Sequence, residues 1–291
     1  MRLGAILIAA GKHANPMLPS GEITVAQRMI ATLQKAGVTL IVVVTGPDDR
    51  KMEKQLAQYG VVFLQNPEPD REHISVRLGM EYLAEKCERV YLMHANYPLI
   101  DPETLLKLQE EEAAVTVPAF CGKRGQPLLV CSSFVCSGSI ASVMDLPGLN
   151  ELPVDDAGIL LIAEEASRRS DLIAEHERKL TRLCPDFSIT RGKTLVDGKL
   201  IALLYLIRET QSVRDACSRM HISYSTAWNL LNRAEDALGY PLILRNKGGP
   251  SGSGSLLTEK GTCLLMACEQ FETAARENLE SLYKRFLERI L

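Results

Sequence analysis

Short apolar runs alternate with helical stretches through the first half of the chain, and this alternation constrains the fold more than any other feature. Ala5–Ala9, Leu40–Thr45, Val61–Gln65 and Val90–Met93 are apolar or β-branched runs of strand length. Between the first two, Thr24–Ala36 has its apolar residues at helical spacing. A strand–helix rhythm of this kind predicts an α/β fold, Rossmann-like, with a mostly parallel sheet and helices on both faces.

The periodicity changes after the segment Arg182–Thr194, which we interpret as the junction between two domains. Just before it, Val154–Ile162 has the pattern of one more strand and Glu164–Lys179 that of a polar helix. Beyond it the pattern predicts three helices and two short strands, over Lys199–Glu209, Val213–Met220, Tyr224–Leu238, Pro241–Leu244 and Leu256–Leu257. At 291 residues the chain is long enough for two cores. We therefore expect domains over residues 1–185 and 192–291.

Composition restricts the class of protein. With 46% apolar and 24% charged residues the chain is an ordinary globular protein, and its net charge of −3 gives no overall attraction to nucleic acid or membranes. The eight cysteines form no CxxC pair, which disfavours a zinc site and fits reduced, mostly buried thiols. Because no apolar run has the length of a membrane span, we expect a cytoplasmic protein with no membrane partner.

The stretch Ser212–Trp228 fits a helix-turn-helix, in which two short helices are joined by a tight turn. Ala216 and Cys217 are small where the helices must approach closely, and Ile222 and Leu230 are suited to the shared core. The second helix begins with polar groups of the kind that reach bases or phosphates of double-stranded DNA. The residues expected at the DNA are Ser223, which also caps the helix, and Tyr224, Ser225, Thr226 and Asn229.

A glycine- and serine-rich stretch, Arg245–Ser255, joins the two short strands that follow. By composition alone it is typical of a flexible linker. Its place directly after a helix-turn-helix favours a wing that contacts DNA phosphates through Arg245 and Lys247.

These motifs together resemble the winged helix of the LysR class, and more closely the DNA-binding domain of ModE-like, molybdate-responsive repressors. The resemblance is carried by Ile222–Trp228, Tyr240–Leu242, the glycine-rich wing and Leu256–Gly261, and it covers about residues 192–280. It implies binding of operator DNA and dimerisation through helices beside the DNA-binding unit.

The C-terminal stretch from Lys260 suits such a dimer. It predicts one helix of about 45 Å, with an apolar stripe formed by Leu264, Cys268, Phe271, Ala275, Leu279, Leu282, Phe286 and Ile290. Packing of this stripe on its own domain is the alternative, but a homodimer is favoured because the stripe is longer than so small a domain can cover.

The first half resembles nucleotidyltransferases of the MobA and molybdopterin cytidylyltransferase type. The resemblance spans about residues 1–175 and rests on motifs in the same order, among them Ile6–Gly11, Asn96–Leu99, Pro118–Leu128 and Asp155–Leu160. It implies a nucleotidyltransferase fold and a site for a nucleotide- or molybdopterin-like ligand. The residues it assigns to that site are Ala9, Ala10, Gly11, Lys12, Ser75 and Asn96.

The departures from this family fall on the positions that carry its chemistry. Asn96 stands where the family has a metal-binding aspartate, and Asn15 where it has a lysine. The family's second acidic motif is replaced by residues 161–165, its Gly-Met by Glu72-His73, and its Gly-His-Pro by Gly125-Gln126-Pro127. Asparagine is a weak ligand for Mg²⁺, and triphosphate transfer needs cations. We therefore expect no catalytic residues and no bound metal, unless Glu164 or Asp156 supplies a shifted ligand.

Three hypotheses follow from these observations. The preferred one is a dimeric transcriptional regulator with a degenerate nucleotidyltransferase-like domain that senses a ligand, linked to molybdenum cofactor or molybdate metabolism. The alternative is an active, Mg²⁺-dependent cytidylyl- or guanylyltransferase with a fused regulatory domain. In the third, the first domain is a docking surface for other proteins.

Overall fold

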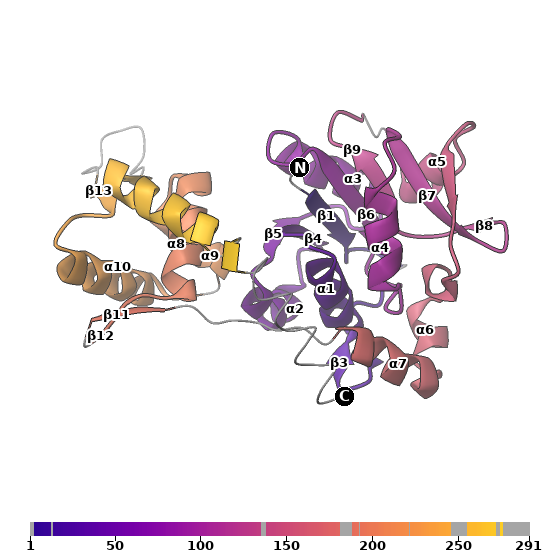
Figure 1. Ribbon diagram of the computed structural model, residues 1–291, viewed down its shortest axis with the longest axis horizontal. Coiled ribbons are helices and arrows are strands. Elements are labelled where there is room, and N and C mark those ends of the chain that lie inside the picture. The colour runs from indigo at the N-terminus through magenta and orange to yellow at the C-terminus, as the bar shows by residue number, and fades with distance from the viewer. Residues whose placement is uncertain are drawn as a thin grey trace. The chain divides into compact units, whose positions relative to one another are not determined.

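The computed structural model describes residues 3–12, 14–134, 138–180, 188–191, 193–220, 222–245, 255–271 and 274–275. The chain divides into two compact units, Met1–Thr181 (unit 1) and Arg182–Leu291 (unit 2). Both units are drawn in Figure 1.

An eight-stranded sheet forms the centre of unit 1, in the order β10-β7-β9-β6-β1-β4-β5 with β8 paired to β7 (Figure 1). Strand β1 is parallel to β4 and β6, β4 to β5, and β7 to β10, whereas β9 is antiparallel to both of its neighbours. The mostly parallel sheet predicted from the sequence is confirmed. The strands are β1 (Leu3–Ile8), β4 (Leu40–Thr45), β5 (Val62–Gln65), β6 (Arg89–His94), β7 (Val115–Phe120), β8 (Lys123–Arg124), β9 (Leu128–Cys131) and β10 (Asn150–Pro153).

Alternate side chains of the strands build a separate core on each face of this sheet. Leu7 and Val43 belong to the cluster that contains α1 (Val25–Lys35), α2 (Arg50–Leu56) and α4 (Pro102–Gln109). Ile6 and Val42 belong to the other cluster, with α3 (Glu72–Leu83) and α5 (Ile140–Met144). Because strands β1, β4 and β6 are buried on both faces, they read as continuous apolar runs rather than as alternating ones.

The segment after β9 differs from the sequence prediction. The expected strand over Val154–Ile162 is wrong: the strand β10 ends at Pro153, and the chain turns into a 3₁₀ helix, η2 (Ala157–Ile159). Asp156 causes the turn, because its carboxylate accepts a hydrogen bond from the Gly158 amide. The expected long polar helix is two helices, α6 (Ala163–Ala166) and α7 (Ser170–Leu180). The remaining short elements of unit 1 are β2 (Pro19–Ser20), β3 (Ile23–Thr24) and η1 (Ala57–Tyr59).

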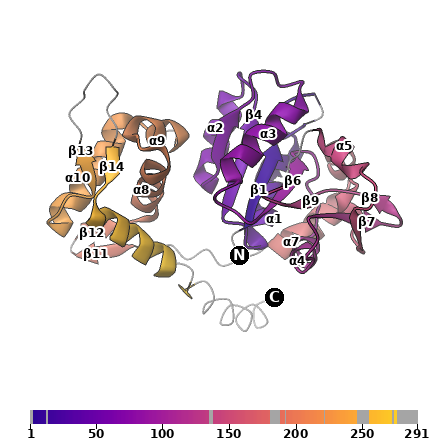
Figure 2. The same ribbon diagram turned by 90° about the horizontal axis from the view of Figure 1, so that it is seen from above.

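Unit 2 is a helical domain with two small hairpins, whose strands β13 and β14 lie side by side in Figure 2. Helices α8, α9 and α10 enclose a core that includes Leu203, Leu204, Ala216 and Leu231. The helix-turn-helix boundaries predicted from the sequence are confirmed for α9 and α10. The elements are β11 (Ile189–Arg191), β12 (Lys193–Val196), α8 (Gly198–Thr210), α9 (Val213–Met220), α10 (Tyr224–Leu238), β13 (Ile243–Arg245) and β14 (Ser255–Leu257).

Part of the predicted junction is structured. Strands β11 and β12 form an antiparallel hairpin between residues 189 and 196, and Leu195 and Val196 pack into the core of unit 2. The composition of this segment did not predict the hairpin, because a short, half-exposed hairpin needs only a few apolar residues.

The C-terminal helix is described over residues 259–271, and residues 276–291 of the predicted stripe lie outside the described residues. It begins at Thr258, whose hydroxyl accepts from the Gly261 amide. A Cβ on Gly261 would lie 2.2 Å from the Leu242 carbonyl oxygen, so only glycine permits this close approach. Along the predicted stripe, Leu264 and Cys268 pack on the domain's own core, whereas Phe271 is exposed.

No helix among the described residues is long and apolar enough to cross a membrane. The expectation of mostly buried thiols holds for Cys87 and Cys217 but is wrong for Cys121 and Cys263, which are exposed.

Candidate functional sites

The carboxyl ends of β1, β4, β5 and β6 meet at one edge of the sheet because these strands are parallel. We call this the carboxyl edge. Ligands of open α/β sheets bind at such an edge. Ala9 and Ala10, predicted to bind a ligand, follow β1 at this edge and are buried. The Ala9 amide donates to the Val44 carbonyl 2.8 Å away, which extends the ladder and brings the next residue, Ala10, to the loop.

Gly11 and Lys12 lie in the loop that begins at the carboxyl edge. Gly11 has a φ of +92°, and a Cβ there would lie 2.7 Å from the Pro69 carbonyl oxygen. Lys12, whose side chain is 82% exposed, forms an ion pair of 3.6 Å with Asp70. The segment after β5 therefore lies against the loop in which the sequence predicted a ligand, and it neutralises part of the charge of Lys12.

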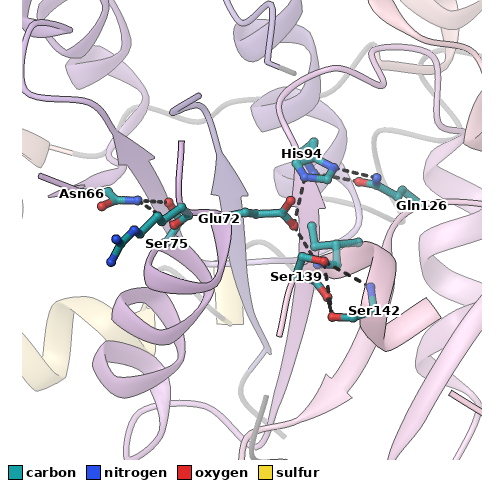
Figure 3. A network of polar contacts seen from close by, with 9 residues as sticks. Asn66, Glu72, Ser75, His94, Gln126, Ser139 and Ser142 are labelled. Atoms are coloured by element: carbon teal, nitrogen blue, oxygen red, sulfur yellow. Dashed lines mark hydrogen bonds and ion pairs between the residues drawn. The ribbon is translucent and has the colours of Figure 1, made fainter. Parts of the chain in front are cut away.

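Ser75, the next predicted ligand residue, is fully buried on α3. Its hydroxyl accepts a hydrogen bond of 2.9 Å from Asn66 Nδ2, and Asn66 is fully buried as well (Figure 3). The same amide nitrogen donates to the Arg71 carbonyl, and Asn66 Oδ1 accepts from the Glu68 amide. The Ser75 hydroxyl is thus used to hold the segment that follows β5 against α3.

Three further polar residues meet at the end of β6 (Figure 3). Gln126 Oε1 accepts from the His94 amide at 2.7 Å, and Gln126 Nε2 donates to His94 Nδ1 at 2.9 Å. In the second contact the amide nitrogen donates and the ring nitrogen accepts. His94 Nε2 lies 3.1 Å from Glu72 Oε1 but without the alignment of a hydrogen bond. Glu72 Oε1 also accepts from the Ile140 amide at 2.7 Å, so the carboxylate is held between β6 and α5.

Asn96 lies just beyond β6, and its Oδ1 atom is buried with no hydrogen-bond partner among the described residues. Asn15, which replaces the family's lysine, donates through Nδ2 to Glu164 Oε1. The other proposed metal ligand, Asp156, accepts from the Asp101 amide, the Thr104 hydroxyl and the Gly158 amide. Burial raises the pKa of the Asp156 carboxyl, against the lowering effect of these three hydrogen bonds.

A divalent cation does not fit these side chains. Mg²⁺ prefers carboxylate oxygens in an octahedral set. At the carboxyl edge the aspartate position is a neutral amide, Glu164 is paired with Asn15, and the Asp156 oxygens are used by three donors. Within the described part of the chain, no cluster of three or more His, Cys, Asp or Glu side chains is placed to hold a metal ion.

The second candidate site is the exposed face at the start of α10. Ser223 caps this helix: its hydroxyl accepts from the Thr226 amide at 3.1 Å. Ser223, Tyr224, Ser225, Thr226 and Asn229 are all exposed, as the sequence predicted for residues that contact DNA. Tyr224 is 53% exposed, and its ring lies edge-on to that of Trp228 with 5.8 Å between ring centroids. The Arg245 side chain and Lys247, predicted for the wing, lie outside the described residues.

Sequence reasoning missed Asn66 and His94, and it noticed Glu72 and Gln126 only as departures from a family pattern. The signal that joins them is their position, since Asn66 follows β5, His94 ends β6 and Glu72 begins α3, all at the carboxyl edge. Parallel topology alone would have placed these three together.

Comparison with known proteins identifies both units. Residues 10–152 match the model of the MobA-like NTP transferase domain, and residues 199–262 match that of the bacterial regulatory helix-turn-helix protein, lysR family. The chain joins these two domains. A nucleotidyl transferase from Methanothermobacter thermautotroptrophicus aligns with a TM-score of 0.50 and 18% identity over 61% of this chain and 98% of its own, which shows the fold of the MobA-like domain.

Two curated relatives match a smaller part of the chain. The molybdenum-pterin-binding protein MopB of Rhodobacter capsulatus is 31% identical over 96 residues, 33% of this chain and 36% of the relative. The transcriptional regulator ModE of Haemophilus influenzae is 32% identical over 77 residues, 26% of this chain and 30% of the relative. The chain thus spans about a third of the length of the curated relatives it matches.

Proposed function

We propose that the protein is a DNA-binding transcriptional regulator linked to molybdate or molybdenum-cofactor metabolism. Its lysR-type domain binds operator DNA, and its MobA-like domain senses a nucleotide- or molybdopterin-like ligand without transferase activity. The relatives include a transcriptional regulator and a molybdenum-pterin-binding protein, which supports the link to molybdenum. A regulator of this kind acts in the cytoplasm, and we include that location in the proposal.

The observation that carries the proposal is the polar face at the start of α10. Four of its side chains, Tyr224, Ser225, Thr226 and Asn229, are exposed in a helix-turn-helix whose opposite face packs into the domain core. Hydroxyl and amide groups on the first turns of such a helix suit base edges and phosphates in the major groove.

We propose a homodimer as the DNA-binding form. The helix over residues 259–271 exposes Met266 and Phe271, which are 49% and 58% accessible. Apolar side chains of this size on one helix favour burial against a second copy. Symmetric binding sites on DNA follow from such a dimer.

The direct test is selection of DNA sequences by the full-length protein from a random pool, followed by titration of the selected duplex at several salt concentrations. The expected result is a symmetric site whose affinity falls steeply with salt. In the double variant Arg245→Gln/Lys247→Gln, binding is expected to weaken and its salt dependence to flatten, because phosphate contacts are lost.

The matched control is Lys123→Gln, which removes an exposed cation from β8 of the MobA-like domain. It should leave affinity and salt slope unchanged. If the DNA affinity of the wing variant kept the salt dependence of the wild type, the wing would not contact DNA phosphates. Failure to select any sequence would contradict the proposal as a whole.

An active nucleotidyltransferase with a fused regulatory domain is the second candidate, and the match of residues 10–152 to the NTP transferase domain favours it. Incubation with CTP or GTP, Mg²⁺ and molybdopterin separates the two functions. We expect no metal-dependent release of pyrophosphate, and steady release would establish the enzyme. In the third hypothesis, a protein-docking surface, neither nucleotides nor cofactor would change the melting temperature.

A further inference from the structure

Leu242 lies where three parts of unit 2 meet: the end of α10, the start of β13 and the start of the C-terminal helix. It is fully buried, and its amide donates to Glu235 Oε1 on α10 at 2.7 Å. Its carbonyl oxygen accepts from the Thr258 amide at 2.9 Å, where the C-terminal helix begins. The backbone of this one residue is therefore held between α10 and the C-terminal helix.

Glu235 supplies an acceptor that the hairpin lacks at this point. The ladder between β13 and β14 begins with the pair Ile243 and Leu257, and the Leu242 amide precedes it. Glu235 Oε1 also accepts from the Ile243 amide at 3.2 Å, so one carboxylate oxygen holds two consecutive backbone amides. Hydrogen bonds to a carboxylate are stronger than those between neutral groups. The carboxylate thus fixes the direction in which the strand leaves α10.

The place of Glu235 in α10 indicates a role outside the helix. It lies in the last turn, where the helix dipole disfavours a carboxylate. Its backbone carbonyl oxygen accepts from the Gly239 amide at 2.8 Å, and Gly239 ends the helix with a φ of +79°. The backbone and the side chain of Glu235 therefore hold both ends of the turn between α10 and β13.

The helix α10 carries the exposed polar face and, through Glu235, holds the strand that leads into the wing. Asn229 and Glu235 are roughly 9 Å apart along the helix axis, and β13 ends at Arg245, one of the two cations predicted for the wing. Because α10 is one continuous helix, the direction in which β13 leaves it determines whether the wing and the polar face can contact one duplex.

We propose that Glu235 is a positioning residue for DNA binding: its carboxylate orients β13 so that the wing and the polar face of α10 contact the same duplex. The inference rests on the proposed function, since it requires that unit 2 binds operator DNA and that the wing contacts phosphates. It assigns to Glu235 a role that needs no contact with the DNA itself.

The test is a salt titration of the selected operator duplex with the full-length wild type, Glu235→Ala, the wing variant Arg245→Gln/Lys247→Gln and the triple variant that combines them. We expect Glu235→Ala to weaken binding about tenfold and to flatten the salt dependence as much as the wing variant does, because phosphate contacts are lost in both. The triple variant should bind no more weakly than the wing variant, because the contact that Glu235 positions is already absent.

Two other substitutions of Glu235 separate orientation from charge. Glu235→Gln keeps the length of the side chain and an acceptor oxygen, so it should retain the salt dependence of the wild type. Glu235→Asp keeps the charge but is shorter by one methylene, so it should behave like Glu235→Ala. It also provides the measurement if the alanine variant folds poorly.

The matched control is Asp236→Ala, which removes an exposed carboxylate from the same turn of α10. It should leave the salt dependence of operator binding unchanged, which shows that loss of a negative charge near the DNA is not the cause. Thermal melts of each variant measure stability separately. A purely structural role of Glu235 would lower the melting temperature and leave the salt dependence as it is in the wild type.

Two results would overturn the inference. One is a wild-type salt dependence in both Glu235→Ala and Glu235→Asp while that of the wing variant is flatter. The other is a triple variant whose loss of affinity equals the product of the two separate losses, because independent contributions multiply. Either result leaves the proposed function intact, since the wild type still binds its operator. If the wild type selects no operator, the proposed function fails and the inference fails with it.

Discussion

Polar side chains are used in opposite ways at the two candidate sites. At the carboxyl edge of unit 1 they bond to one another, as in the pair of fully buried residues Asn66 and Ser75. At the start of α10 in unit 2 they lie at the surface, as Ser225 and Asn229 do. Internal hydrogen bonds stabilise the fold, whereas exposed groups remain accessible to a partner. Substitutions in unit 1 should therefore affect stability, and substitutions on α10 should affect DNA binding.

The largest effect is expected from Arg28→Met in unit 1. Arg28 is fully buried, and its guanidinium donates to the Ser20 hydroxyl and carbonyl and to Glu177. Each hydrogen bond to a charged group contributes about 1.5–3 kcal/mol, so losing the contacts of this guanidinium should cost several kcal/mol of unfolding free energy, with the smallest share from Glu177, whose side chain is 43% exposed. Hydrogen exchange of β1 and β4 under native conditions measures the loss. Arg77→Met, an exposed position on α3, is the control and should cost less than about 0.5 kcal/mol. Neither variant should change DNA affinity.

The next largest effect is a pH dependence of the stability of unit 1, and it is caused by His176. Burial lowers its pKa from 6.5 to about 4, while Nε2 bonds the Ile100 carbonyl oxygen. The unfolded chain binds a proton on His176 more tightly than the folded chain does. The stability that this residue contributes is therefore complete above pH 6.5 and is lost as pH falls towards 4. It amounts to about 3 kcal/mol. Denaturant unfolding of His176→Gln, followed by far-UV circular dichroism, should show a weaker loss between pH 7 and 4.5. An identical loss in both proteins would assign the effect to other groups.

A smaller effect is expected at the exposed polar face of α10. Asn229→Ala should weaken operator binding by about 1–3 kcal/mol, because an asparagine at a base edge makes paired hydrogen bonds. Unfolding of unit 2, followed by fluorescence of the single tryptophan Trp228, should change by less than about 0.5 kcal/mol. A stability loss equal to the affinity loss would show that Asn229 belongs to the fold and not to the DNA contact.

The smallest effect distinguishes the roles of two serines, Ser223 and Ser225. Ser223 caps α10, so Ser223→Ala should lower the stability of unit 2 by about 1 kcal/mol. Ser225 bonds only the Ser223 hydroxyl among the contacts described for it, so Ser225→Ala should be nearly neutral for stability and should reduce DNA affinity instead. Thermal melts and operator titrations of the two variants distinguish a capping residue from a contact residue. If both variants lost only stability, the exposed face would have no role in binding.

The sequence predicted α9 and α10 with their ends because their signals are local. A serine cap, helical spacing of apolar residues and a terminal glycine act within a few residues of one another. The strand predicted over Val154–Ile162 failed because the hydrogen bond that the Gly158 amide donates to the Asp156 carboxylate is a local alternative to a sheet ladder, and apolar spacing does not reveal it.

At the carboxyl edge the sequence alone identified which residues depart from the transferase pattern, Asn15, Glu72, Asn96 and Gln126 among them. It did not determine how those departures are accommodated. Glu72 and Gln126 are 54 positions apart in the numbering, and both contact His94 only because β6 is paired with β1 and β9. Residue type and periodicity are properties of the sequence, so they were enough to predict the two domains and the helix-turn-helix. The tertiary structure decides which polar groups form hydrogen bonds and ion pairs with one another, because the distances between them are set only when the sheet has formed.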